Sequence, residues 1–584
     1  MQGYATIMIM QKGELADPDC YTRMNRVVQL YESGKWYESI NARSNTPFGE
    51  SLHWTRPLDV LLFTGAWLAS PVAGFKTGLF WWGVLISPFL LAASVVALPW
   101  AFRPILGAHT SNLISLLFIF QYGAIAFYII GRPDHHSLLG FIFIIMTGFI
   151  LRLIMSSFNK TICYVAGLMS AVSLWILVES MLIIFLGLLL LGIFWIFEDE
   201  DFADKNLHYS AALFLFTGAA LIMERPWYDL TRIEYDKISI VHWFIFGLIS
   251  LFWIVVFFSR NHLIIPQKVR AGRFMIASLA AVITALCIWL LFPDFYRGTF
   301  VGVDPRIVPI WLDKVKEVRS PLNRDFLVPL IQLIGSAVIG ILYIGFVLWK
   351  EPYKNLRGWI FILSGIVLFA SAGMFERRLL LYGNIMTIVP LAAILGRLLI
   401  WETSHVKHLM RTFIRPLTII SFCVIFLFVG YVCQNIIEKG SVVVEGNDRL
   451  VPLSQVCDEL NKLSINQGRP TRILACIDYG PEILYRTQYE VVGTPHHRNA
   501  QGILDTFKIM TAESDQEAHE LILKREIDMI LISDSPGERN FVSAPQKRST
   551  FYERLVTEGS VDWLRVVELP PHLSPSYRLF RVIR

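Results

Sequence analysis

Acidic and imidazole side chains occur in short polar segments of an otherwise apolar sequence. Asp17 and Asp19 lie in one segment, and Asp134, His135 and His136 follow one another in a second. Carboxylates at such spacings can share a hard divalent cation, and Mn²⁺ also accepts an imidazole ligand. Both patterns also have ordinary explanations, since Asp17 suits the N-cap of a helix and the second segment suits a turn at the lipid headgroups.

Two further segments carry charged residues, carboxylates that could bind a metal in one and arginines that could bind a phosphate in the other. Asp313 and Glu317 lie among basic residues in one of them, which is also typical of a solvated loop. Arg377 and Arg378 begin an apolar stretch in the other. Guanidinium groups bind phosphate in a bidentate manner, although arginines at such positions also extend towards lipid headgroups.

Aromatic and basic residues at positions 53–56 offer a third kind of chemistry. His53 supplies an imidazole, Trp54 an indole that can stack on a sugar, and Arg56 a phosphate-binding guanidinium. A tightly folded interfacial loop with an aromatic anchor explains the same residues equally well. The adjacent His496 and His497 are expected to form a surface pair rather than a ligand set.

The composition indicates that these residues are held by a membrane protein. Hydrophobic residues make up 54% of the 584 positions and charged residues only 17%, below the roughly 25% typical of soluble proteins. The 52 basic and 47 acidic residues leave a net charge of +5. Without a run of Lys and Arg, this balance predicts membrane lipid but no nucleic acid as a partner.

Twelve apolar stretches are close to the roughly 20 residues that cross a bilayer as a helix. They predict a polytopic α-helical membrane domain over residues 79–434. The stretches are 79–101, 112–130, 138–157, 161–177, 180–198, 207–224, 237–259, 273–293, 326–349, 357–374, 379–401 and 413–434.

The composition changes after residue 434. Short β-rich runs alternate with helical patterns over 435–584, which predicts a soluble α/β domain. Its Cys457 and Cys476 either pair or remain free thiols. Residues 1–78 are interpreted as an N-terminus followed by a large first outer loop.

The basic loops near 260–273, 350–357 and 402–412 orient the chain, because cytoplasmic loops are enriched in Lys and Arg. This topology places every polar segment described above, and the soluble domain, on the outer side. It also requires a span before residue 12, where only seven apolar residues occur. We therefore expect that a thirteenth, N-terminal span is missing from this sequence.

The outer segments resemble those of the C-type (GT-C) membrane glycosyltransferases, and most closely the catalytic subunit of oligosaccharyltransferases, which has thirteen spans. "DPDCYTRMNRVVQLYESGKWYES" is similar to that family's first outer loop, which matches Asp19 to a metal-binding and acceptor-activating aspartate. "PDHHS" is similar to its second acidic motif, which implies that Asp134 and His136 are metal ligands. "KVKEVRSP" matches the core of a Ser-Val-Ser-Glu motif at Glu317, without the serines.

The soluble part of the sequence carries one more element of the resemblance. "CIDYGPEIL" is similar to the family's Trp-Trp-Asp-Tyr-Gly acceptor motif, which implies that Asp478, Tyr479 and Gly480 contact the acceptor. Cys476 and Ile477 replace both tryptophans. The acceptor is therefore left open between a protein, a lipid-linked glycan and a growing polysaccharide.

The residues and the resemblance together predict a glycosyltransferase at the outer, periplasmic face of a bacterial inner membrane. It would move a sugar or oligosaccharide from a polyprenyl-(pyro)phosphate donor, assisted by Mg²⁺ or Mn²⁺. The alternative is a transporter or flippase of lipid-linked saccharide, which would place charged groups near the bilayer midplane. The predicted site comprises catalytic Asp19 and Glu317, metal ligands Asp19, Asp134, His136 and Glu317, phosphate-binding Arg56, Arg377 and Arg378, acceptor-binding Asp478, Tyr479 and Gly480, and the secondary candidates Asp17, His53, Trp54 and His135.

Overall fold

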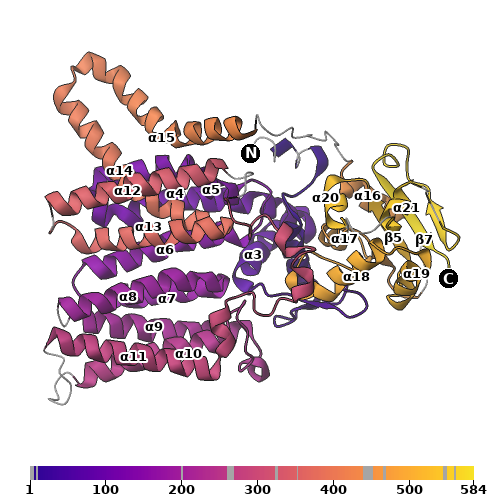
Figure 1. The fold of residues 1–584 in the computed structure, drawn as a ribbon, viewed down its shortest axis with the longest axis horizontal. Coiled ribbons are helices and arrows are strands. Elements are labelled where there is room, and N and C mark those ends of the chain that lie inside the picture. Colours follow the sequence, from indigo (N-terminus) through magenta and orange to yellow (C-terminus); the bar gives the residue numbers. More distant parts are fainter. Residues whose placement is uncertain are drawn as a thin grey trace.

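Long helices packed side by side form one end of the molecule, and a smaller domain with a β-sheet forms the other, in a computed structural model of the chain (Figure 1). The structure describes residues 6–7, 9, 11–198, 201–259, 269–322, 327–351, 353–438, 451–463, 468–543, 549–557, 559 and 561–584.

The helical end contains α2 to α15. Ten helices among the described residues are long and apolar enough to cross a membrane, and α7 is a shorter apolar helix. The bounds are α2 Pro18–Ser33, α3 Arg56–Ala73, α4 Phe75–Ile119, α5 Tyr122–Ile125, α6 His135–Met155, α7 Lys160–Ile176, α8 Met181–Phe197, α9 Asp201–Glu224, α10 Ile240–Ser259, α11 Arg270–Leu291, α12 Leu327–Lys350, α13 Leu356–Phe375, α14 Leu380–His405 and α15 His408–Glu438.

The predicted stretches fall on these helices with one substantial difference. α4 covers 79–101 and part of 112–130, and it changes direction at Gly107, whose φ is 76°. The Ser115 hydroxyl donates to the Val95 carbonyl at 2.6 Å, so the two halves fold back on each other. The chain then leaves the helix after Ile119, where Gln332 of α12 donates to the Phe120 carbonyl and accepts from the Tyr122 amide. The number of membrane crossings stays a prediction.

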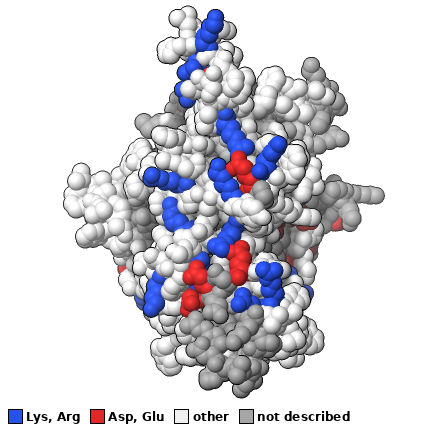
Figure 2. Space-filling model, turned by 90° about the vertical axis from the view of Figure 1, so that its left-hand side faces the viewer, with Lys and Arg blue, Asp and Glu red and all other residues white. Residues whose placement is uncertain are grey.

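The two ends of the bundle differ in charge. The connections between α6 and α7, α12 and α13, and α14 and α15 lie at the end away from the sheet. Lys354 and Lys407 lie in these connections, and Lys160 and Arg357 begin the helices that follow them. Figure 2 shows Lys and Arg outnumbering acidic residues on that face. Most of the predicted basic loop at 260–273 lies outside the described residues.

The smaller domain is a mixed α/β fold, as the sequence predicts. Its sheet has the order β4-β3-β5-β7-β6, with β3, β4 and β5 parallel and β7 antiparallel to β5 and β6. Every residue of β5 is buried, because helices cover both faces of the sheet. Cys457 and Cys476 are buried free thiols. The bounds are α16 Leu453–Lys462, β3 Arg472–Leu474, α17 Gly480–Arg486, β4 Glu490–Val491, α18 Ala500–Met510, α19 Asp515–Lys524, β5 Met529–Ser533, α20 Pro536–Phe541, α21 Phe551–Thr557, β6 Leu564–Val567 and β7 Tyr577–Val582.

The N-terminal part joins the two ends of the molecule. α2 packs against α17, and the segment that follows α2 forms a hairpin of β1 (Ile40–Asn41) and β2 (Glu50–Ser51). Ser44 of this hairpin pairs with Val491 at the edge of the main sheet. The first outer loop is more regular than predicted, because residues from Arg56 onwards form α3, which packs along α4. The predicted domain boundaries after residues 78 and 434 stay a prediction.

Candidate active site

Asp17 and Asp19 are positioned by the start of α2. The Asp17 carboxylate caps the helix by accepting from the Cys20 amide at 3.1 Å, so the N-cap explanation of this residue is correct. The cap places Asp19 in the first turn, where its carboxylate is 37% exposed and lies 3.9 Å from Nδ1 of His496.

Asp134 is the N-cap residue of α6, as Asp17 is of α2. Its carboxylate accepts from the His135 amide at 2.6 Å and lies 2.5 Å from Nδ1 of His135. His136, one position further, has Nε2 3.6 Å from a Glu317 oxygen. Nδ1 of His136 is buried and has no hydrogen-bond partner among the described residues.

Arg132 lies between the carboxylates that these helices position. Its guanidinium is 3.1 Å from Asp17 and 3.6 Å from Asp134, and it forms an ion pair with Glu317. Glu317 comes from the long loop before α12, 185 positions along the chain. A single cationic group thus gathers acidic residues from three separate outer segments, although Arg132 was not among the predicted site residues.

The pKa values of the two catalytic candidates, Glu317 and Asp19, are shifted in opposite directions. Burial raises the pKa of Glu317, but the contact with His136 and the charge of Arg132 outweigh burial and lower the pKa to about 2. Burial also raises the pKa of Asp19, and the nearby charges of Asp17, Glu317 and Asp134 raise it further. Asp19 therefore takes up a proton more readily than Glu317.

These groups border a cavity of about 640 Å³ between the helical end and the soluble domain. Asp17, Asp19, Arg132 and Glu317 line one part of it, and Arg377 lies beside Glu317 in the lining. The soluble domain contributes Asp478. The fold thus brings five predicted site residues to one cavity: Asp17, Asp19, Glu317, Arg377 and Asp478.

Two predicted phosphate-binding arginines are engaged elsewhere. The Arg56 guanidinium lies 3.2 Å from Asp59 and donates to the carbonyls of Trp36 and Glu38 at 2.5 and 2.8 Å. Arg378 pairs with Glu179 at 2.5 Å and with Glu376 at 2.8 Å. Neither side chain lines the cavity, and a role for either in phosphate binding stays a prediction.

Two predicted acceptor-binding residues serve the interior of the soluble domain. The Tyr479 hydroxyl lies 2.7 Å from the Ser533 hydroxyl at the end of β5. A Cβ on Gly480 would lie 2.3 Å from the Gly493 carbonyl, so glycine there permits close packing. Of the three predicted acceptor-binding residues, only Asp478 lines the cavity.

The aromatic segment before α3 is more enclosed than a sugar platform would be. Trp54 is 5% exposed, with the Arg23 guanidinium 3.9 Å from its ring centre and His496 packed against its edge. His496 is itself buried, and its Nε2 lies 3.0 Å from the Thr22 hydroxyl. The prediction of a surface pair at 496–497 is therefore wrong for His496, which packs behind Asp19.

Comparison with known proteins rests on structure alone. No protein-family model and no curated protein sequence matches the chain. The apo oligosaccharyltransferase of Archaeoglobus fulgidus superposes with a TM-score of 0.72 at 12% identity, covering 96% of this chain and 77% of that one. The chain has the GT-C fold of an oligosaccharyltransferase.

Other structures of the archaeal protein share this GT-C fold. One, in complex with an inhibitory peptide and a dolichol-phosphate, has a TM-score of 0.71 at 12% identity, covering 96% of this chain and 76% of that one. Another, in complex with Zn and sulfate, has a TM-score of 0.62 at 13% identity, with coverages of 89% and 64%.

Proposed function

We propose that the protein is a membrane glycosyltransferase that moves a sugar or oligosaccharide from a polyprenyl-(pyro)phosphate donor to an acceptor at the outer face of the membrane. The observation that carries this proposal is the convergence of Asp17, Asp134 and Glu317 on Arg132, beside a cavity that the soluble domain closes. The GT-C fold supports it, since the archaeal neighbour was solved with a dolichol-phosphate.

The acidic groups suit a resident divalent cation. Four carboxylates, those of Asp17, Asp19, Asp134 and Glu317, lie close together, and the guanidinium of Arg132 contacts three of them. Oxygen-rich donor sets of this kind favour Mg²⁺ or Mn²⁺, and Nδ1 of His136, which has no hydrogen-bond partner among the described residues, suits Mn²⁺. We propose Asp19, Asp134, His136 and Glu317 as ligands; when bound, the cation would neutralise charge on the departing phosphate.

The chain's own groups account for the remaining steps. The bond from the sugar's anomeric carbon to the phosphate oxygen breaks with its electrons on the phosphate, and the acceptor forms a bond to that carbon. Asp19, whose pKa is raised by burial and neighbouring carboxylates, takes the acceptor's proton. Arg377 lines the same cavity and binds the phosphate, while Asp478 orients the acceptor from the soluble domain.

The position of the charges favours a transferase over a carrier of lipid-linked saccharide. Asp134 lies at the N-terminal end of α6 and Glu317 in a loop, so the acidic groups are at the outer end of the bundle rather than at mid-span. The basic face at the opposite end supports a cytoplasmic location for that end, and thus a periplasmic or exterior site.

Transfer from a synthetic polyprenyl-pyrophosphate sugar, followed by mass spectrometry, tests the proposal. The donor would be offered to the purified full chain with Mn²⁺ and a mixture of protein, lipid and glycan acceptors. We expect Glu317→Gln to lower the rate at least a hundredfold, since it removes a charge that contacts Arg132 and His136. Asp313→Asn is the matched control, because Asp313 is an exposed carboxylate of the same loop.

Chelation of divalent cations should also abolish transfer, and Mn²⁺ should restore it. Equal transfer by Glu317→Gln and the parent, or full activity in chelator, would contradict the proposed site. Release of free sugar without any acceptor product would point to a hydrolase instead.

A further inference from the structure

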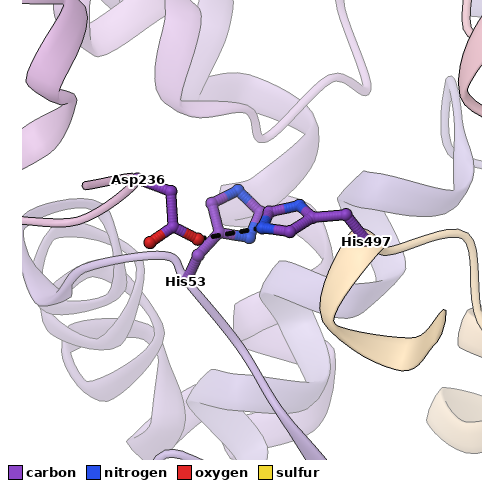
Figure 3. A group of neighbouring side chains, drawn as sticks. All are labelled: His53, Asp236 and His497. Carbon is purple, nitrogen blue, oxygen red and sulfur yellow. Dashed lines mark hydrogen bonds and ion pairs between the residues drawn. The ribbon is translucent and has the colours of Figure 1, made fainter. Parts of the chain in front are cut away.

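Two histidines and an aspartate meet where the soluble domain contacts the helical end, and none of them lines the acidic cavity. His53 precedes α3, Asp236 lies in the connection before α10, and His497 belongs to the soluble domain. Figure 3 shows the three side chains directed toward one another from these separate segments. The proposed transfer reaction uses none of them.

The distances suit shared ligation of one ion. Each residue offers an atom, and these atoms all lie within 4.8 Å of one another. Nε2 of His497 lies 2.9 Å from an Asp236 oxygen, and the rings of His53 and His497 are 4.5 Å apart. Nδ1 of His53 is buried and has no hydrogen-bond partner among the described residues.

We propose that His53, Asp236 and His497 bind a Zn²⁺-type transition-metal ion. Two imidazoles and one carboxylate are ligands that Zn²⁺ accepts, with a water at the remaining position. The side chains of Asp236 and His497 are 18% and 13% exposed, so the ion and this water can reach the site. The mixed nitrogen and oxygen donors distinguish it chemically from the carboxylate-rich cavity.

Arg498 provides the outer contacts that such a site needs. Its guanidinium donates to both Asp236 oxygens, at 3.0 and 2.6 Å, which fixes the orientation of the carboxylate. Arg498 also forms an ion pair with Glu234 at 3.0 Å, which holds its guanidinium in place beside Asp236.

The ion would fasten the soluble domain to the helical end. One of its ligands lies in the soluble domain and the other two lie in segments next to α3 and α10. His497 is also adjacent to His496, whose imidazole contacts Thr22 and lies 3.9 Å from Asp19. Binding of the ion therefore stabilises the docking of the domain that completes the cavity.

The test is metal binding by the purified full chain that carries Asp134→Asn and His136→Gln, so that the acidic cavity does not contribute. Calorimetry with Zn²⁺ should give about one equivalent, and Co²⁺ should give the visible absorption bands of a low-coordinate, nitrogen-ligated ion. Adding His53→Gln and His497→Gln should remove both signals. His572→Gln, at an exposed histidine of the same domain, is the control for surface binding and should change neither.

Asp236→Asn is a second variant, used in case the double histidine variant fails to fold. It preserves the shape of the side chain but removes its charge, so Zn²⁺ should bind at least tenfold more weakly while the elution volume and circular dichroism stay unchanged. Undiminished binding after loss of both histidines, or no binding before their loss, would overturn the proposal. Neither result depends on sugar transfer, so the metal site and the proposed function fail separately.

Discussion

In the proposed metal site, Asp19 is the residue at which a proton and the cation would compete most directly. Its pKa is raised by burial and by Asp17, Glu317 and Asp134, so its carboxylate ionises at higher pH than an ordinary aspartate. A divalent cation requires the ionised form. We expect Mn²⁺ affinity to increase with pH through the range above the ordinary aspartate pKa, and this slope to be smaller in Asp19→Asn.

Calorimetric titration of the full chain with Mn²⁺ at a series of pH values measures this slope. Asp313→Asn should keep the parent slope, since Asp313 is exposed and apart from the cluster. A parent slope that persists unchanged in Asp19→Asn would show that another group controls the binding.

Single residues were predictable where a local pattern sufficed. Asp17 occupies the N-cap position that the sequence predicts, whereas Asp134, for which the sequence suggested a turn, is also an N-cap. The pairing of Arg56 with Asp59 was not predicted, because it depends on α3, which makes residues three apart neighbours. The central position of Arg132 was not predicted either, since its contact with Glu317 joins residues 185 positions apart.

At the scale of elements, the start of α17 should tolerate little change. A Cβ at Gly480 would lie 2.3 Å from the backbone carbonyl of Gly493, which cannot move without displacing its strand connection. We expect Gly480→Ala to destabilise the soluble domain by about 1 to 3 kcal/mol, as overpacking does. Gly537→Ala in α20 is the matched control, because a Cβ there meets nothing within 4 Å.

Thermal unfolding of both variants, with limited proteolysis to follow the soluble domain, measures the difference. The midpoint should fall by several degrees in Gly480→Ala and by less than about two degrees in Gly537→Ala. Equal midpoints would mean that the contact with Gly493 relaxes without cost.

Elements were predictable from hydropathy where helices are continuous, and less so where they break. Apolar length located α6 to α15, but it could not indicate that the stretch at 112–130 ends its helix near Phe120. That break depends on Gln332 of a distant helix, which supplies the hydrogen bonds that the interrupted backbone requires. α3 was overlooked because its apolar residues directly follow a turn-rich segment.

At the scale of the whole molecule, the predicted alternation of loops between the two sides of the membrane indicated which polar segments lie on the same side. It could not indicate which of these segments are in contact. Asp236 and His497 lie 261 positions apart, and only the docking of the soluble domain brings them together. The same docking places Asp478 in the cavity and buries His496 behind Asp19.

Glu50 lies at the centre of this docking. It is 3% exposed, and one oxygen accepts from the Ser44 hydroxyl of the outer hairpin and from the Thr494 hydroxyl of the soluble domain, the latter at 2.6 Å. Burial raises its pKa to about 7, although the two hydroxyl donors partly oppose this effect. The carboxyl is therefore largely neutral below neutral pH when the parts are docked.

A raised pKa in the docked state means that stability is lost as the pH rises. The contribution is fully present below the ordinary glutamate pKa and is lost as the pH rises from there to about 7, because over this range the unfolded chain ionises the carboxyl and the docked state does not. The change amounts to roughly 3 kcal/mol over the whole titration. We expect the unfolding midpoint to decrease between about pH 5 and 7.5 more steeply in the parent than in Glu50→Gln, which cannot ionise.

Thermal unfolding of the full chain at both pH values measures this effect, with protease cleavage between the helical end and the soluble domain as a second readout. Glu38→Gln, at a partly exposed glutamate before the same hairpin, should retain the parent's pH dependence. The difference between the two variants isolates Glu50 from the histidines that titrate over the same range. If Glu50→Gln follows the parent at both pH values, the docked interface does not depend on the protonation of this carboxyl, and the hydroxyl contacts alone maintain it.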